Sequence, residues 1–249
     1  MMNRRKIALI TGGMGGLGEA ICRKMAQAGY RVAATYSPHN DHAAGWIEAH
    51  KQDGFDFSAY RVDVADHMSC RAAIMDIVRD MGSIDVLVNN AGITRDATLR
   101  KMTREDWRMV IATDLDSVFN MTRQVLHGML ENRWGRILNI SSVNGQKGAY
   151  GQANYSAAKA AVHGFTKALA LEMADKGITV NTISPGYLRT GMVMKMPKEI
   201  LETKILPEIP FGRLGEPDEV AGLVVYLCSE EAGFVTGANI AINGGQHMC

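Results

Sequence analysis

A hydroxyl, a phenol and an amine occur close together in the segment S-V-N-G-Q-K-G-A-Y-G-Q-A-N-Y-S-A-A-K, at Ser142, Tyr155 and Lys159. The alanines at 153, 157, 158, 160 and 161 predict a helix around the last two. Residues four apart share one helix face, so the ammonium should lie beside the phenol and lower its pKa from about 10. Ser142 could present its hydroxyl to the same carbonyl oxygen. The segment would then hold a proton donor, a group that tunes it and an anchor for the oxygen.

A Tyr-x-x-x-Lys pair is a weak signal when it stands alone, because such spacing also arises by chance. The alternative is a surface helix that carries an aromatic side chain and a solvated lysine. The remainder of the chain has to decide between the two interpretations.

Composition narrows the class of protein. The chain has 249 residues and a net charge of +1 with dispersed charges, so it shows no basic footprint for nucleic acid. No apolar stretch approaches the length of a membrane span, and the first apolar run is too short for a signal peptide. The cysteines lack the spacing of metal ligands, so we expect free thiols, no metal and a cytoplasmic protein; they are Cys22, Cys70, Cys228 and Cys249.

Short apolar runs alternate with helical patterns along the chain. We expect strands at 6–11, 31–36, 57–62, 84–89, 136–141, 178–183 and 239–243, and helices at 19–30, 41–52, 66–81, 103–132, 153–176 and 218–229. Thr103 and Asp106 form a capping-box pattern, and Pro217 suits a first helical turn. Wholly apolar strands that alternate with helices indicate a parallel sheet covered on both faces. The fold prediction is therefore α/β: a Rossmann-type doubly wound parallel sheet of about seven strands, in a single domain spanning 1–249.

In such sheets ligands bind beyond the carboxyl ends of the strands. That rule gathers the polar and glycine-rich strand ends into one crevice; they are the turn 11–18, Asp63, Asn89, Asn90, Ser141, Ser142, Ser184, Pro185 and Gly186.

The turn T-G-G-M-G-G-L-G at 11–18 follows an expected strand and precedes an expected helix, as a phosphate-binding turn requires. Gly12 and Gly16 would let the backbone approach a pyrophosphate, and Gly18 would permit close helix packing. A tight turn without a ligand is the alternative. The expected dinucleotide contacts in the turn are Gly12, Met14, Gly15, Gly16, Leu17 and Gly18.

The second expected strand ends at Thr35, Tyr36 and Ser37, without an acidic residue to bind an adenosine 2′-hydroxyl. A 2′-phosphate is then not repelled, which favours NADP over NAD, although no arginine clamp is evident there. Tyr36, Ser37 and His39 are candidate contacts; a solvated loop histidine is equally consistent with His39.

Taken together, these motifs resemble the short-chain dehydrogenases/reductases. They are T-G-x-x-x-G-x-G at 11–18, N-N-A-G at 89–92, Ser142 thirteen residues before Tyr155, Lys159, and S-P-G at 184–186. The resemblance covers nearly the whole chain and implies hydride transfer between NADPH/NADP+ and a carbonyl. It implies that Tyr155 donates the proton, that Lys159 binds the nicotinamide ribose and that Ser142 bonds the carbonyl oxygen. The remaining cofactor contacts that it implies are Asp63, Val64, Asn90, Ala91, Gly92, Pro185, Gly186 and Thr190.

One position departs from the family, which has a fourth catalytic residue, an asparagine in T-N-L, where this chain has Asp114 in T-D-L. A carboxylate there should stabilise the ammonium of Lys159 and offset its field at Tyr155. We expect activity to be retained at the usual or a reduced level, with an altered pH profile.

Within the family, the segments 89–103, 141–160, 184–187 and 243–248 resemble the acetoacetyl-CoA reductases of polyhydroxybutyrate synthesis. That resemblance implies NADPH-dependent reduction of acetoacetyl-CoA, or another 3-oxoacyl-CoA, to the (R)-3-hydroxyacyl-CoA by a homotetramer. It places Asp96, Gln152 and Tyr187 at the substrate, with Lys101 at the coenzyme A arm. A solvated charged rim is the alternative for Arg95, Arg100, Lys101 and Lys147.

Two other functions stay open. A 3-oxoacyl-[acyl-carrier-protein] reductase performs the same chemistry on a tethered substrate, and Arg133 and Lys176 could meet an acidic carrier. A non-catalytic NADP-binding regulator would need a damaged catalytic set, for which Asp114 is the one hint. Finally, we expect residues 187–212 to form a mobile substrate lid, with a rigid, packed helix pair as the alternative.

Overall fold

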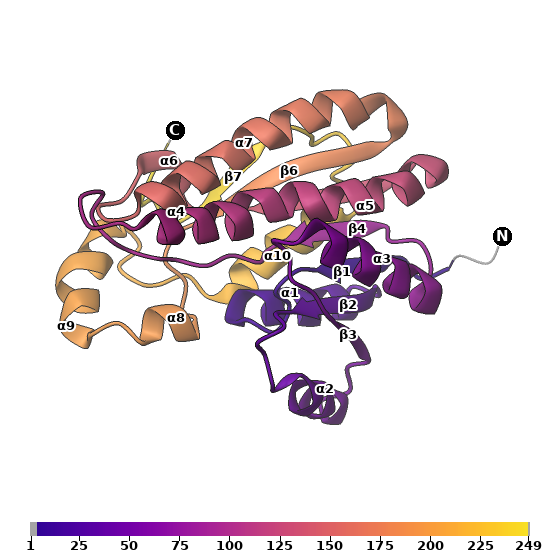
Figure 1. Cartoon of the computed structure of the whole chain (residues 1–249), viewed down its shortest axis with the longest axis horizontal. Helices are drawn as coiled ribbons and strands as arrows, with labels where there is room; N and C mark the ends of the chain where they lie inside the picture. Colours follow the sequence, from indigo (N-terminus) through magenta and orange to yellow (C-terminus); the bar gives the residue numbers. More distant parts are fainter. Residues whose placement is uncertain (1–3, 249) are drawn as a thin grey trace.

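The computed structural model describes residues 4–248 and contains one seven-stranded parallel sheet (Figure 1). The strands lie in the order β3-β2-β1-β4-β5-β6-β7, so the chain reverses its winding direction between β1 and β4. This confirms the predicted doubly wound sheet. The strands are β1 Ile7–Ile10, β2 Arg31–Tyr36, β3 Phe57–Arg61, β4 Val86–Asn89, β5 Gly135–Ile140, β6 Ile178–Pro185 and β7 Asn239–Ile242.

Helices cover both faces of the sheet (Figure 1). One face packs against α1 Gly16–Gln27, α2 Ala43–Gln52 and α10 Pro217–Cys228, and the other against α3 His67–Met81, α5 Ser117–Asn132 and α7 Ala153–Met173. Each face has its own apolar cluster, with Ile21 and Leu227 in one and Ile77 and Met129 in the other. Most predicted boundaries agree with the structure to within a few residues.

The helix expected at 103–132 is interrupted. Its capping box at Thr103 and Asp106 is present, but α4 ends at Ile111 (Arg104–Ile111) and a π-helical turn, Ala112–Asp116, precedes α5. A π turn accommodates one more residue than an α-helical turn, and such turns are frequent at functional sites. Here the turn carries Asp114, which is fully buried.

The segment expected as a lid forms several short helices between β6 and α10. They are α8 Gly191–Met194, α9 Lys198–Ile200, a π turn Leu201–Ile205 and a 3-10 turn Leu206–Glu208. Ile205 and Ile209 pack with Leu214 in a small apolar cluster of their own. α8 and α9 lie at one end of the molecule (Figure 1), and this small cluster is separate from the two clusters on the faces of the sheet.

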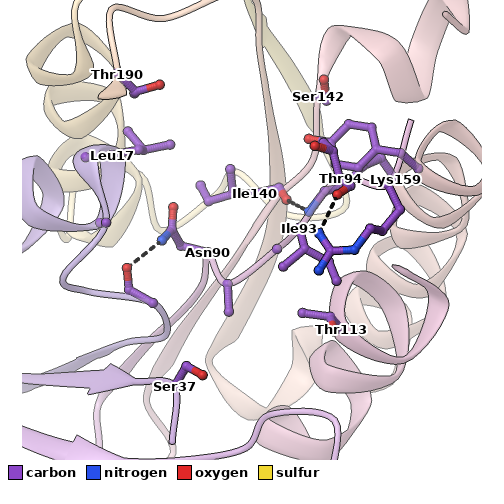
Figure 2. Close-up of a pocket in the computed structure, with 18 of the residues that line it drawn as sticks. Leu17, Ser37, Asn90, Ile93, Thr94, Thr113, Ile140, Ser142, Lys159 and Thr190 are labelled. Carbon is purple, nitrogen blue, oxygen red and sulfur yellow. Dashed lines mark hydrogen bonds between the residues drawn. The ribbon is translucent and has the colours of Figure 1, made fainter. Parts of the chain in front are cut away.

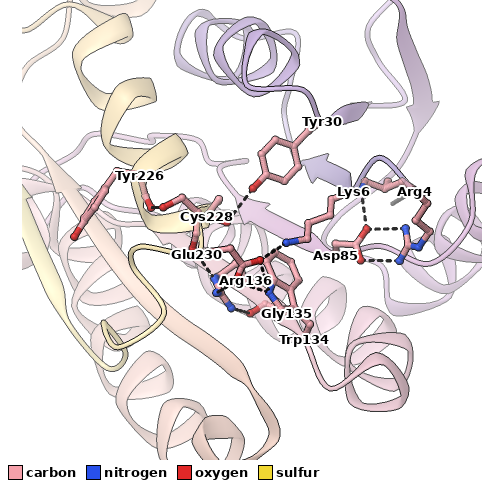
Figure 3. A network of polar contacts seen from close by, with 12 residues as sticks. Arg4, Lys6, Tyr30, Asp85, Trp134, Gly135, Arg136, Tyr226, Cys228 and Glu230 are labelled. Carbon is pink, nitrogen blue, oxygen red and sulfur yellow. Dashed lines mark hydrogen bonds and ion pairs between the residues drawn. The ribbon is translucent and has the colours of Figure 1, made fainter. Parts of the chain in front are cut away.

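A polar network joins the strands at their amino ends (Figure 3). Asp85 accepts hydrogen bonds from both terminal nitrogens of Arg4, at 2.9 and 2.7 Å, and from the backbone N–H of Ile7 at 2.7 Å. Buried Arg136 stacks on Trp134 and donates to the carbonyl of Ser229. These contacts hold the edge of the sheet that lies opposite the predicted crevice.

Cys22, Cys70 and Cys228 are buried free thiols, whereas Cys249 lies outside the described residues. Within residues 4–248, no helix combines the length and apolarity needed to cross a membrane. Across the same residues, no three His, Cys, Asp or Glu side chains are grouped so that they could hold a metal ion.

Candidate active site

The carboxyl ends of the strands open into a cleft of about 1240 Å³ (Figure 2). It brings together residues from both halves of the chain, as the strand order requires. The predicted site residues that line it are Gly12, Met14, Gly15, Gly16, Leu17, Gly18, Tyr36, Ser37, Asp63, Val64, Asn90, Ala91, Gly92, Asp96, Ser142, Gln152, Tyr155, Lys159, Pro185, Gly186, Tyr187 and Thr190.

Four residues lie elsewhere. Asn89 and Ser184 were expected in the crevice, which is wrong: both are buried, with Asn89 bonded to Thr122 and Asn139, and Ser184 bonded to Asn239. Lys101 is exposed and does not line the cleft. Asp114 lies behind the cleft wall with no exposed surface.

The glycine turn has the shape that a pyrophosphate needs. Gly12 has a φ of +62°, and a Cβ at Gly18 would lie 2.2 Å from the carbonyl oxygen of Gly12, so neither position tolerates a side chain. No side chain caps the N-terminus of α1 at Gly15, which leaves its first N–H groups facing the cleft. The turn therefore fits the diphosphate of a dinucleotide.

Thr11 fixes this turn against the end of β4. Its hydroxyl accepts hydrogen bonds from the backbone N–H groups of Asn90 and Ala91 at 2.9 and 3.0 Å. The amide of Asn90 returns the contact by donating to the carbonyl of Thr11 at 2.9 Å. Thr11 thus joins the two strands between which the winding direction reverses.

The end of β2 forms the cleft wall at Tyr36, Ser37, Pro38, His39 and Asn40. These lining residues include neither a carboxylate nor a lysine or arginine. Ser37 accepts a hydrogen bond from the backbone of His39 at 3.3 Å, so its hydroxyl hydrogen is free to donate to a ligand.

Tyr155 and Lys159 occupy one face of α7, as their spacing predicts. The Lys159 Nζ lies 5.6 Å from the centre of the Tyr155 ring and donates to the carbonyl of Ile140 at 3.1 Å. Its ammonium also forms an ion pair with Asp114 Oδ2 at 3.2 Å. The lysine is therefore held on three sides, by its own helix, by β5 and by the π turn.

Asp114 is fixed from the other side by the chain that follows β4. The backbone N–H of Ile93 donates to Asp114 Oδ1 at 2.9 Å. A Cβ at Gly92 would lie 2.7 Å from Asp114 Oδ2 and 3.3 Å from Lys159 Nζ. Only glycine allows the backbone to pass this close to the ion pair.

The pKa of Tyr155 differs from the expectation that Lys159 lowers it. Burial raises the pKa of Tyr155 above its usual value, by more than the neighbouring Lys159 lowers it, and the carboxylate of Asp114 raises it further. The expected net lowering of the tyrosine pKa is therefore wrong for this chain. The expected stabilisation of the Lys159 ammonium by Asp114 is confirmed, because burial lowers the pKa of Lys159 but its carboxylate partner raises it on balance.

Ser142 has a structural role, as the cap of a helix, in addition to the expected contact with a carbonyl oxygen. Its Oγ accepts the backbone N–H of Asn144 at 3.1 Å and so caps α6, Val143–Lys147, a short helix that the sequence analysis missed. The Ser142 hydroxyl also bonds to the Tyr155 side chain, so a carbonyl oxygen placed between the two would meet both groups.

A chain of side-chain amides crosses one wall of the cleft. Asn144 donates to Gln152 at 2.9 Å, and Gln152 donates to Asp96 at 2.9 Å. Tyr187, which follows β6, also lines the cleft, and Tyr150 lines it with 93 % of its surface exposed. The wall between Ser142 and Tyr155 is thus cross-linked to the loop after β4.

Several positioning groups were missed. Thr11 belongs to the glycine motif, so the sequence could have identified it. Ile93 and Ile140 contribute only backbone atoms, and their roles therefore cannot be inferred from the residue types at these positions. His163, on α7 beyond Lys159, contacts Ser141 and also escaped attention.

A phosphate-binding turn and a tyrosine–lysine pair that share one cleft define a class of protein, the oxidoreductases that use a nicotinamide dinucleotide. Residues 12–247 match the family model described as enoyl-(acyl carrier protein) reductase. The chain is 54 % identical to the acetoacetyl-CoA reductase of Cupriavidus necator over 244 residues, 98 % of this chain and 99 % of that protein. It is 54 % identical to the acetoacetyl-CoA reductase of Shinella zoogloeoides over 97 % of this chain and 98 % of that one.

A third relative, the 3-oxoacyl-[acyl-carrier-protein] reductase of Staphylococcus aureus, is 42 % identical over 99 % of this chain and 100 % of its own. The chain belongs to the short-chain dehydrogenase/reductase family. It is accordingly an oxidoreductase that uses a nicotinamide cofactor.

Proposed function

We propose that this protein reduces acetoacetyl-CoA, a 3-oxoacyl-CoA, to (R)-3-hydroxybutanoyl-CoA with NADPH, and so supplies the monomer of polyhydroxybutyrate. The main support is that Ser142, Tyr155 and Lys159 line the same cleft as the glycine turn. In addition, the chain is 54 % identical to two acetoacetyl-CoA reductases. Fold alone would not assign the substrate, so the near-complete coverage of these relatives matters.

The side chains divide the reaction between them. The cofactor supplies the hydride when it is bound. Ser142 donates a hydrogen bond to the carbonyl oxygen and holds it beside Tyr155. As negative charge develops on that oxygen, Tyr155 transfers its phenolic proton to it. Lys159 would stabilise the phenolate that remains and would also hold the nicotinamide ribose of the bound cofactor, while Asp114 keeps the ammonium in place.

NADPH is the proposed cofactor because the cleft wall at the end of β2 has no carboxylate to bind a ribose 2′-hydroxyl. The hydroxyl of Ser37 and the side chains of Tyr36 and His39 would receive the 2′-phosphate there. Asp63 and Val64 would border the adenine, and Pro185, Gly186 and Thr190 would border the nicotinamide.

The thioester would enter along the wall formed by Asp96, Gln152 and Tyr187. Arg95 lines the cleft, and Arg100 and Lys101 are exposed on the same connection between β4 and α4, where they would attract coenzyme A phosphates. Lys147 already forms a 2.8 Å ion pair with Glu208 of the segment 187–212.

A carrier-protein thioester is the second candidate substrate, supported by the 42 % identical relative that bears that name. Arg133 and Lys176, which could have met an acidic carrier, precede β5 and β6 at the amino edge of the sheet. Lys176 is engaged there by Asp175 at 2.6 Å. This placement favours the coenzyme A substrate for a cleft that lies at the opposite edge.

We further propose that four copies assemble. Met68, Met75, Trp107 and Phe119 are exposed on α3, α4 and α5, and an oligomer would bury this apolar face. Light scattering should give a mass about four times that of the chain.

We also propose that the segment 187–212 closes over the nicotinamide and acyl groups. The protein would reside in the cytoplasm, because its buried free thiols suit a reducing compartment.

One assay tests the proposal. The purified protein is mixed with acetoacetyl-CoA and either NADPH or NADH, oxidation of the cofactor is followed at 340 nm, and the product is resolved by chiral chromatography. We expect NADPH oxidation and the (R)-product. A much higher kcat/KM for the acyl-carrier-protein thioester would assign the second candidate substrate instead, and cofactor binding without turnover would indicate a regulator.

A further inference from the structure

We propose that His163 is a positioning residue of the reductase reaction: its Nε2–H ties the ends of β5 and β6 to α7 and thereby fixes Ser142 relative to Lys159. The inference rests on the proposed function for its kinetic consequence, but its geometric basis is independent of the substrate.

His163 lies one helical turn beyond Lys159 on α7. Its Nε2 is 2.8 Å from Ser141 Oγ at the end of β5 and 3.4 Å from Ser184 Oγ in β6. Both serines are buried, with 4 % and 0 % exposure. One imidazole nitrogen of α7 thus contacts the ends of two neighbouring strands.

The hydrogen-bond network assigns the proton on this imidazole. Ser141 donates its one hydroxyl hydrogen to the carbonyl of Lys159 at 2.8 Å, and Ser184 donates its own to Asn239 Oδ1 at 2.7 Å. Both oxygens are therefore left as acceptors, and only a protonated Nε2 satisfies them. Burial and the nearby Lys167 lower the pKa of His163, which favours the neutral imidazole with its proton on Nε2.

These contacts bear directly on the catalytic groups. Ser141 immediately precedes Ser142, and its hydroxyl holds the backbone of Lys159. A Cβ at Gly145 of α6 would lie 2.8 Å from the Lys159 carbonyl carbon and 3.0 Å from Ser141 Oγ, so α6 packs on the same junction. A shift of Ser141 would therefore move Ser142 and Lys159 apart, and misplacement by about 1 Å can cost about 100-fold in rate.

The test compares His163→Gln, which keeps a donor near the Nε2 position, with His163→Leu, which has similar bulk and no donor. We expect the leucine variant to lose about 10- to 100-fold in kcat and to bind NADPH more weakly, with the glutamine variant within about 3-fold of the parent. NADPH affinity is measured by fluorescence titration and folding by thermal melting. His127→Leu, on the exposed surface of α5, is the matched control.

The outcomes separate cleanly. A loss in kcat or NADPH affinity that glutamine restores supports the inference. A leucine variant within twofold of the parent in both quantities overturns it, as does an equal loss in both folded variants. If His163→Leu does not fold, His163→Asn, whose shorter amide falls short of the serines, takes its place. Failure of the proposed function would show differently, as no turnover by the parent, while NADPH affinity still compares the variants.

Discussion

The carboxylate of Asp114 lies 3.2 Å from the ammonium of Lys159, and these two side chains are 0 % and 5 % exposed. A charge pair this well shielded from water interacts more strongly than one on the surface. Burial raises the pKa of Tyr155, and because Asp114 partly cancels the positive field of Lys159, that pKa stays above its usual value.

Asp114→Asn should move the pH profile of the reduction. Tyr155 donates a proton, so kcat/KM at saturating NADPH is constant below the tyrosine pKa and falls above it. The substitution removes a negative charge that raises this pKa, so the fall should begin at a lower pH. Asp116→Asn, an exposed change in the same π turn, is the control. Superimposable profiles for Asp114→Asn and the parent would mean that the carboxylate does not tune Tyr155.

Tyr155→Phe should abolish most of the activity while leaving the cofactor bound. Loss of a general acid typically costs about 10²- to 10⁴-fold in kcat. NADPH affinity should remain within a few-fold of the parent value, because the ring and Lys159 stay in place. Tyr226→Phe, a change at a half-exposed tyrosine of α10, should have the parent's kinetics. Retention of more than a tenth of kcat by Tyr155→Phe would argue against Tyr155 as the proton donor.

Gly18→Ala should disrupt the dinucleotide turn. The added Cβ would lie 2.2 Å from the Gly12 carbonyl and 2.9 Å from the Asn90 amide, so backbone has to move. We expect NADPH binding to weaken by at least about tenfold, since the turn fits the pyrophosphate only in its present form. Gly222→Ala in α10 meets nothing within 4 Å and should leave binding unchanged. Equal affinities for the two variants would remove the turn from the cofactor site.

Ser37→Asp should convert the cofactor preference. A carboxylate at the end of β2 repels a 2′-phosphate and accepts a hydrogen bond from a 2′-hydroxyl. The dissociation constant for NADPH should rise about tenfold, with that for NADH unchanged or lower. Fluorescence titration with both cofactors measures this directly, and Ser37→Asn separates the charge from the change in size. A parallel change for both cofactors would place the 2′-phosphate away from Ser37.

Asp85→Ala should destabilise the fold without impairing the chemistry. It removes the acceptor for Arg4 and for the Ile7 N–H, and we expect a loss of about 2 kcal/mol in the free energy of unfolding. Urea denaturation at fixed protein concentration measures the change. Asp76→Ala removes an exposed ion pair with Arg79 and should cost far less. Equal midpoints for the two variants would contradict a structural role for the amino-edge network.

The sequence predicted those features that local pattern determines. Apolar strands, the glycine turn and the spacing of Tyr155 and Lys159 each depend on a few neighbouring residues. The π turn at Asp114 could not be foreseen, because it arises from contacts with Ile93 and Lys159 that are distant in sequence. The direction of the Tyr155 pKa shift was missed for a related reason: burial is a property of the folded chain, and it outweighs the effect of one adjacent charge.

The network of Arg4, Asp85 and Arg136 at the amino edge has a consequence for how this protein can evolve. Chemistry is concentrated at one end of the sheet, where buried charges and side-chain-free glycines reduce tolerance to change. Hydrogen bonds that connect neighbouring strands are concentrated at the other end of the sheet. A substitution there changes the free energy of folding without touching a bound substrate. Folding stability that is lost when the cleft adapts to a new acyl group can therefore be restored by substitutions at the amino ends of the strands. The substrate range and the folding stability of this protein are thus able to vary independently.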